Sequence, residues 1–250
     1  MDVRDTTIDA VIIKSRTYKE QDKLLTYFSL EQGKGLAIAR GACKVSSGLG
    51  SIAQSFCRAH LTLTPPRNGV SYISQAMPET SFITLDAGLT AMAYASYIGE
   101  LTDIAMPPGK PSAGFFALLL TVFSLLKMDD DPERAARYFE LHLLDELGLL
   151  PALDGCSKCY RGLPGGMFHI SAKQGCLLCE SCGREDQAPL ICAGAVQTIK
   201  RLLDTPITRL PSLKISPTLM NEIEAAIAYF MDYHLEYSSR AKKVLKQLLD

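Results

Sequence analysis

The pattern of apolar and polar positions changes from strand-like to helix-like near residue 80. Before that point, five short runs have the alternation or the β-branched content of strands, and turn residues separate them. A closed barrel is the usual way for a few short strands to remove their exposed edges, so we expect a small barrel, and specifically an OB-fold. The five runs are Ile8–Ile13, Leu24–Leu30, Gly35–Arg40, Phe56–Leu63 and Val70–Gln75.

Helical spacing of apolar residues follows Pro78. The uncharged run Pro111–Leu126 is shorter than the roughly 20 apolar residues that a bilayer crossing needs, so it predicts a buried helix in a soluble protein. The other helices are bounded by capping residues and prolines. We expect helices from an Asp86 cap to Ala105, over Ala113–Leu126, from Pro132 behind an Asp131 cap to Gly148, over Ala195–Leu203, and from Ser216 to about Gln247.

Two C-x-x-C pairs interrupt the helical part of the chain. Cys156-Ser-Lys-Cys159 and Cys179-Glu-Ser-Cys182 are separated by nineteen residues that include several glycines. Two residues between cysteines allow one tight turn to direct both sulfurs to a single ion, and a loop brings the second pair round to complete a tetrahedron. Four thiolates leave no open coordination position, so the spacing predicts one structural zinc ion. Two surface disulfides or a dithiol redox pair are the alternatives.

The compartment in which the chain folds bears on these alternatives. The stretch Met1–Asp9 is polar and lacks the apolar core of a secretory signal, so we expect a protein that is not secreted. Cysteines in a reducing compartment stay available to metal.

The ligand set has a local ambiguity. Cys176-Leu-Leu-Cys179 is itself a C-x-x-C, so Cys176 could replace Cys179 or Cys182, and His169 is a weaker candidate. The remaining cysteines lie far away in sequence and have the character of small apolar residues. They are Cys43, Cys57 and Cys192.

These patterns predict an α+β protein of several domains. An OB-fold barrel spans residues 1–80, a helical domain spans 81–150 and 185–250, and a four-cysteine zinc finger, 151–184, is inserted in the helical domain.

Charge is unevenly distributed although the net charge is −1. Residues 1–80 hold 10 Lys and Arg against 7 Asp and Glu, whereas residues 81–150 hold 4 against 10. Basic side chains at strand ends can follow a phosphate backbone, and Tyr18, Tyr27 and Tyr72 could stack on bases. From the charge alone, an ordinary solvated surface explains these basic residues as well as nucleic-acid binding does. The candidate DNA contacts are Lys14, Arg16, Lys19, Lys23, Lys34, Arg40 and Lys44.

Enzyme signatures are missing from the sequence. It has no G-x-S-x-G, no G-x-x-x-x-G-K-[ST], no G-x-G-x-x-G after a strand and no H-E-x-x-H. His60 and His142 lie in regular apolar patterns, where a core or surface histidine is the ordinary explanation. We therefore expect a protein that is not an enzyme.

The order of these features resembles the RecO family of bacterial recombination mediators. The likeness covers most of the chain, and although each motif alone is loose, their order and spacing are specific. The motifs are Ala10–Arg16 with Asp22-Lys23 and Gly33-Lys34, Ala39–Ala42, Phe139–Leu144, Leu153–Cys159, Gly175–Cys182 and Tyr233–Leu235.

The resemblance implies a fold and a role. It implies an N-terminal OB-fold, a helical body and an inserted zinc finger. It also implies binding of single- and double-stranded DNA, annealing of complementary strands, and action with RecR to load RecA onto strands covered by single-strand-binding protein. The location that it implies is the bacterial cytoplasm, in association with the nucleoid.

Two positions depart from the family pattern. Cys176 stands where the second of two glycines is expected, and this favours Cys156, Cys159, Cys179 and Cys182 as the metal ligands. Tyr160 stands where glycine is common after the second ligand, which affects the expected loop geometry.

Two other functional classes compete with a DNA-binding mediator. One is a protein-interaction adaptor that works through its acidic helical body. The other is a zinc-ribbon protein that binds RNA or acts in transcription, which requires basic and aromatic residues near the thiolates. Such residues are present at Lys158, Tyr160, Arg161, Lys173 and Arg184.

Overall fold

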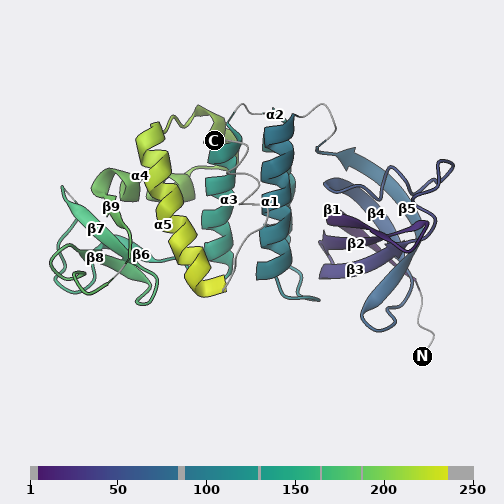
Figure 1. Ribbon diagram of the computed structural model, residues 1–250, viewed down its shortest axis with the longest axis horizontal. Coiled ribbons are helices and arrows are strands. Elements are labelled where there is room, and N and C mark those ends of the chain that lie inside the picture. The colour runs from purple at the N-terminus through teal and green to yellow at the C-terminus, as the bar shows by residue number, and fades with distance from the viewer. Residues whose placement is uncertain (1–4, 84–87, 129–130, 164, 187, 236–250) are drawn as a thin grey trace. The chain divides into compact units, whose positions relative to one another are not determined.

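The computed structural model describes residues 5–83, 88–128, 131–163, 165–186 and 188–235 (Figure 1). The chain divides into two compact units, with the boundary between Pro132 and Glu133. The first unit groups the barrel with the two helices that follow it, and the second contains the cysteine motifs and the later helices. The domain ranges expected from the sequence stay a prediction, and each unit is described here by itself.

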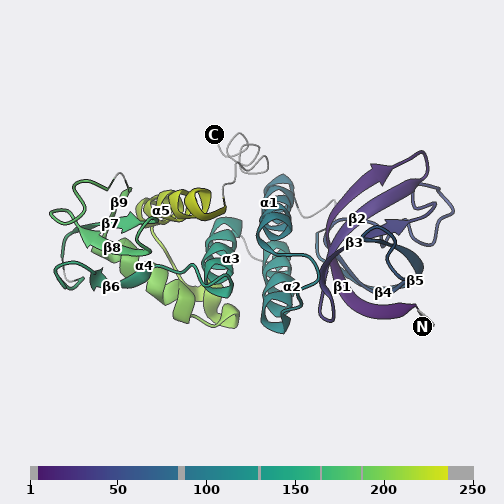
Figure 2. The same cartoon turned by 90° about the horizontal axis from the view of Figure 1, so that it is seen from below.

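Five strands close into a barrel in the first unit (Figures 1 and 2). They are β1 (Thr6–Tyr18), β2 (Asp22–Ser29), β3 (Gly33–Ala39), β4 (Cys57–Leu63) and β5 (Val70–Ser81). The order around the barrel is β1-β2-β3-β5-β4; β1 pairs antiparallel with both β2 and β4, and β3 pairs in parallel with β5. This closed five-stranded topology confirms the predicted OB-fold.

Two strands are longer than their sequence patterns indicated. β1 continues past Ile13 to Tyr18, and β5 continues past Gln75 to Ser81. The register of β1 against β2 shifts between Ile12 and Lys14, so the apolar alternation is interrupted there while the pairing continues. A strand that pairs with one neighbour along its first half and with another along its second half must be long.

Both faces of β2 are buried, because one faces the barrel core and the other faces a helix. Leu25 and Tyr27 belong to the barrel core. Phe28 points the other way and meets Phe115 of α2 (Ala113–Met128), with ring centroids 5.1 Å apart in an edge-to-face arrangement. The helical layer therefore covers part of the outer face of the barrel.

The long connection between β3 and β4, residues 40–56, closes one end of the barrel. Its Ala42, Ile52 and Ala53 are buried in the barrel core. Ser15 in the second half of β1 holds the connection through its hydroxyl, which donates to the Ala53 carbonyl at 2.8 Å. The small residues of this segment therefore form a cap with defined contacts.

Helix α1 (Leu89–Ala105) packs closely on β1. The predicted Asp86 cap lies outside the described residues. Gly99, in the middle of α1, makes the close approach possible, because a Cβ atom at this position would lie 2.5 Å from the carbonyl oxygen of Ile13.

The second unit contains a small sheet that the sequence analysis did not predict. Its strands are β6 (Ala152–Cys156), β7 (Met167–Ser171), β8 (Cys176–Cys179) and β9 (Leu190–Cys192), in the order β6-β8-β7-β9. The helices of this unit are α3 (Pro132–Glu146), α4 (Ala193–Asp204), the 3-10 helix η2 (Ile207–Ser212) and α5 (Pro217–Leu235).

Helices α4 and α5 support this sheet. Both contact β9, and α5 also contacts β7. The carboxylate of Glu222 on α5 accepts a hydrogen bond from the backbone N–H of Cys192 at 2.9 Å, where β9 ends and α4 begins. The predicted final helix is described as far as Leu235, and its expected continuation to Gln247 lies outside the described residues.

None of the helices, within the described parts of the chain, combines the length and the apolar content that a membrane crossing requires.

The close contact at Gly99 predicts an unusual response to alanine. Gly99→Ala is expected to lower the free energy of unfolding by about 1–3 kcal/mol, because overpacking outweighs the gain of about 1 kcal/mol in helix propensity. Gly114→Ala in α2 is the matched control, since a Cβ atom there has no neighbour within 4 Å and should not destabilise the protein. Urea titration of both variants measures the difference. Equal or greater stability of Gly99→Ala would show that the helix and β1 are not this close.

Candidate metal centre and nucleic-acid interface

Four cysteine sulfurs meet at one end of the small sheet. The Sγ atoms of Cys156, Cys159, Cys179 and Cys182 all lie within 4.8 Å of one another. The sulfurs of Cys159 and Cys179 are 3.6 Å apart, whereas a disulfide requires about 2.05 Å. All eight cysteines are free, so the disulfide alternative has no support in this arrangement.

Each C-x-x-C pair forms a tight turn stabilised by its own backbone. In the first turn the N–H of Tyr160 donates to the carbonyl of Cys156, and in the second the N–H groups of Cys182 and Gly183 donate to the carbonyl of Cys179. The strands position these turns, because Cys156 ends β6 and Cys179 ends the neighbouring β8. The local turn and the parallel strand pair together bring the two motifs into one cluster.

Hydrogen bonds prepare one of the sulfurs for the thiolate form. The hydroxyl of Ser181, 3.2 Å from the Cys179 sulfur, and the N–H of Cys182 lower the pKa of Cys179 to about 6. The pKa of Cys182 is raised to about 12, first because its thiol is hydrogen-bonded to the Cys179 sulfur and also because the site is partly desolvated. Without a cation to share the negative charge, the cluster therefore favours deprotonation of Cys179 and opposes deprotonation of Cys182.

This donor set fits a tetrahedral metal ion. Sulfurs bound to zinc at about 2.3 Å lie about 3.8 Å from one another, which agrees with the observed spacing. Four soft sulfur donors with no carboxylate or histidine among them are typical of a closed structural site.

The two weaker ligand candidates lie outside the cluster. Cys176 is buried at the start of β8, at the opposite end of that strand from Cys179. The Nδ1 atom of His169 is 2.9 Å from the carbonyl oxygen of Ala188, and its ring packs against Gly183. The structure therefore leaves the set Cys156, Cys159, Cys179 and Cys182.

Five of the seven candidate DNA contacts gather at the end of the barrel that the 40–56 connection closes. We call this set the basic pole. Two hydrogen bonds hold the start of the connection against the turn between β1 and β2. The N–H of Gly41 donates to the Asp22 side chain at 2.8 Å, and the N–H of Cys43 donates to the Gln21 carbonyl at 3.0 Å. The basic pole consists of Arg16, Lys19, Lys23, Arg40 and Lys44.

A groove of about 820 Å³ opens beside the basic pole. Arg16 and Lys23 line it together with hydroxyl groups, including those of Ser15, Thr17 and Ser55. The ammonium of Lys23 donates to the Ala53 carbonyl at 3.0 Å, which fixes its stem while its charge stays at the groove. Cations combined with hydroxyl donors form a surface that suits phosphate oxygens.

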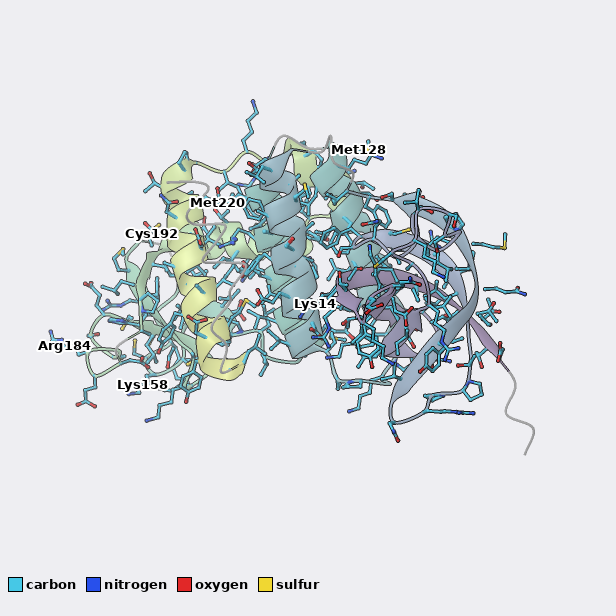
Figure 3. All side chains as sticks on the ribbon, turned by 45° about the vertical axis from the view of Figure 1, so that its right-hand side comes forward. Lys14, Met128, Lys158, Arg184, Cys192 and Met220 are labelled. Carbon is cyan, nitrogen blue, oxygen red and sulfur yellow. The ribbon has the colours of Figure 1, made fainter. Side chains whose placement is uncertain are left out.

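The other two candidate contacts have their charge engaged elsewhere. The ammonium groups of Lys14 and Lys34 lie 3.4 Å and 3.7 Å from the carboxylate oxygens of Asp103 on α1. Lys34 also donates to the Asp103 backbone carbonyl. Figure 3 labels Lys14 where β1 meets this helix. One acidic residue thus offsets two of the seven cations.

Two of the three tyrosines considered for base stacking remain accessible. The guanidinium of Arg40 lies over the ring of Tyr72, 4.1 Å from its centroid, and the ammonium of Lys19 lies 5.4 Å from the centroid of Tyr18. Tyr27 is in the barrel core, where burial raises its pKa to about 12. The expectation that Tyr27 offers a stacking face is therefore wrong.

Sequence reasoning missed two features of this site. Asp103 was not connected with Lys14 or Lys34, because 89 and 69 residues separate them along the chain. The second is the conformation of Tyr160, whose φ of 58° is in the left-handed region. The only signal was the position of Tyr160 where glycine is common.

A closed OB-fold barrel with a basic pole, in one chain with a four-cysteine cluster, defines the class of protein by its architecture. The comparisons with known proteins identify the family. Residues 1–82 match the family described as Recombination protein O N terminal, and residues 87–243 match Recombination protein O C terminal. The chain therefore belongs to the RecO family.

Relatives named DNA repair protein RecO align over nearly the whole chain. The protein from Desulforamulus reducens is 31% identical over 242 residues, covering 96% of this chain and 94% of the relative. The protein from Pelotomaculum thermopropionicum is 34% identical over 229 residues, covering 91% and 88%. The protein from Symbiobacterium thermophilum is 32% identical over 245 residues, covering 96% of each.

The backbone of Tyr160 predicts an order of stability among substitutions. Glycine adopts positive φ freely, so Tyr160→Gly should keep or raise the free energy of unfolding, by up to about 1 kcal/mol. Tyr160→Val should lower it by about 1 kcal/mol, because a β-branched side chain tolerates this region poorly. Denaturant titration of the metal-loaded protein measures both. A stability loss in the glycine variant as large as that in the valine variant would contradict the left-handed conformation.

Proposed function

We propose that this protein is a DNA-repair mediator that binds single- and double-stranded DNA through the basic pole and anneals complementary strands. Acting with RecR, it helps to load RecA onto strands covered by single-strand-binding protein. The role is non-enzymatic, and it takes place in the cytoplasm in association with the nucleoid. The observation that carries this proposal is the gathering of five cations at one end of an OB-fold barrel, two of them lining a groove, in a member of the RecO family.

Electrostatic attraction supplies most of the affinity in this proposal. Cations that neutralise phosphates release counterions, and contacts to phosphate carry no base information. The stacked pair of Arg40 and Tyr72 offers a cation and an aromatic face together, which suits an unpaired strand. Binding should therefore be strong at low salt and largely independent of sequence.

The basic pole predicts a defined salt response. If about five phosphates are neutralised on a single strand, log K should fall against log salt with a slope near −3 to −4. Arg40→Glu should weaken binding to every oligonucleotide by about fivefold to tenfold and make the slope shallower by about 0.7, since one phosphate contact is lost. Fluorescence anisotropy measures both quantities, and a strand-annealing assay at two salt concentrations should follow the same order.

The matched control is Arg67→Glu. Arg67 is an exposed arginine in the turn between β4 and β5, at the end of the barrel away from the basic pole. Its reversal should leave affinity, slope and annealing unchanged. A flat salt response of the parent protein, or equal losses in the two variants, would contradict the proposed interface.

We infer that the four-cysteine cluster holds one structural zinc ion. The sulfur spacing and the tight turns support this inference, and a filled tetrahedron gives the ion no position for a substrate. Cys156, Cys159, Cys179 and Cys182 would hold the ion, which would tie the turn after β6 to the turn after β8.

Metal removal should destabilise the second unit. Structural zinc contributes on the order of 10 kcal/mol of coupled folding free energy, so chelation should lower the thermal midpoint markedly. Elemental analysis should find about one zinc per chain, and Cys179→Ser should lose it. Cys43→Ser is the control, because this exposed thiol lies outside the cluster and its loss should leave both zinc content and midpoint unchanged. An unchanged midpoint after verified metal loss would refute the structural role.

A further inference from the structure

The finger carries an exposed aromatic and basic surface that the basic pole does not use. Tyr160, directly after the second cysteine, is 88% exposed. Its neighbours Lys158 and Arg161 are exposed as well. Single exposed hydrophobic side chains are common on protein surfaces, so the residues around this ring decide whether it has a partner.

The backbone at Tyr160 makes this exposure harder to explain by folding alone. A second aromatic residue with positive φ, Phe56 at 65°, is buried and packs on Phe123 with ring centroids 5.3 Å apart. Packing offsets the unfavourable conformation of Phe56. The ring of Tyr160 lies in solvent, so burial gives it no comparable compensation. Unfavourable backbone conformations without a packing reason are concentrated at functional positions.

The cations near Tyr160 come from both cysteine turns. The ammonium of Lys158 is 3.5 Å from the carbonyl oxygen of Cys182, so it reaches the second turn, where Arg184 follows. Figure 3 labels Lys158 and Arg184 at the outer end of the finger. Two exposed acids, Glu180 and Glu185, are also present. Arg161 brings the exposed cations to three, and the half-buried Asp186 brings the acids near these turns to three.

Lys173 is separate from this set. It lies in the turn between β7 and β8, at the end of that hairpin opposite the metal ligand Cys179. Lys173 was expected near the thiolates from its place in the sequence, but the strands separate it from them. Lys173 therefore serves as an internal control for a change of charge on the same sheet.

We propose that the outer end of the finger is a second contact for single-stranded DNA, in which Tyr160 stacks on a base and Lys158, Arg161 and Arg184 hold the flanking phosphates. An aromatic face with cations around it is the usual combination for unpaired strands, because every base has a face on which to stack. The inference rests on the proposed DNA-binding role but uses residues of the other unit. Cations that only balance the charge of the thiolates would not require an exposed ring.

The absence of tryptophan from the sequence allows a local test. In Tyr160→Trp the new indole is the only one in the chain. With the zinc-loaded full chain and a thymidine oligonucleotide, its emission should be quenched, with the same concentration dependence as the anisotropy of the labelled strand. Lys173→Trp is the matched control, and its emission should not change.

Affinity measurements complete the test. Tyr160→Gly should bind the oligonucleotide about tenfold more weakly, which is within the range for loss of one stacked base, with no fall in thermal midpoint. Arg184→Glu should also weaken binding, whereas Lys173→Glu should not. The proposal would be overturned if the parent protein bound the oligonucleotide while the emission of Tyr160→Trp did not change and Tyr160→Gly bound with unchanged affinity. The proposed interface on the barrel would not be affected by that result. A change in zinc retention without any change in DNA affinity for Arg184→Glu would overturn it too. Absence of binding by the parent would remove both proposals.

Discussion

The parallel pairing of β3 with β5 is the constraint on which the proposed interface depends. Without it the five strands would form an open sheet, and the 40–56 connection would have no barrel end to close. Closure brings the end of β3, the turn after β1 and this connection together at one end of the barrel. In the proposed interface, residues from three separate segments then present their cations to one ligand. The fold therefore creates a charge density that the nearly neutral composition of the chain does not suggest.

Intramolecular pairing then decides which cations stay available. Lys14 and Lys34 meet Asp103 on α1, while Arg16 and Lys23 of the basic pole face a groove lined by hydroxyl groups. Arg40 and Lys19 are oriented over tyrosine rings, so their charges are held in place without being neutralised. In the finger, the four cysteines form one cluster between the two turns, and the exposed cations and Tyr160 lie around it.

The sequence could predict features whose causes are local. The spacing of the four cysteines brings both pairs into one cluster, and Gly33, at a φ of 67°, turns the chain between two of the expected strands. The sequence could not reveal which face of β2 is the inner one, because Leu24 to Ser29 are all buried. Tyr27 was therefore expected on the outer surface, although it lies in the barrel core. The strands of the finger are three to five residues long, too short for a periodic signal. The pairing with Asp103 depends on tertiary structure alone.

Hydrogen exchange of the zinc-loaded protein, measured with and without a single-stranded oligonucleotide, tests the central claim most directly. Residues 16–23 and 40–56 should become protected, while the turn formed by residues 65–69 at the other end of the barrel should exchange as before. Protection confined to residues 65–69, or to the helices, would contradict the account, because the strand would then contact a surface other than the basic pole.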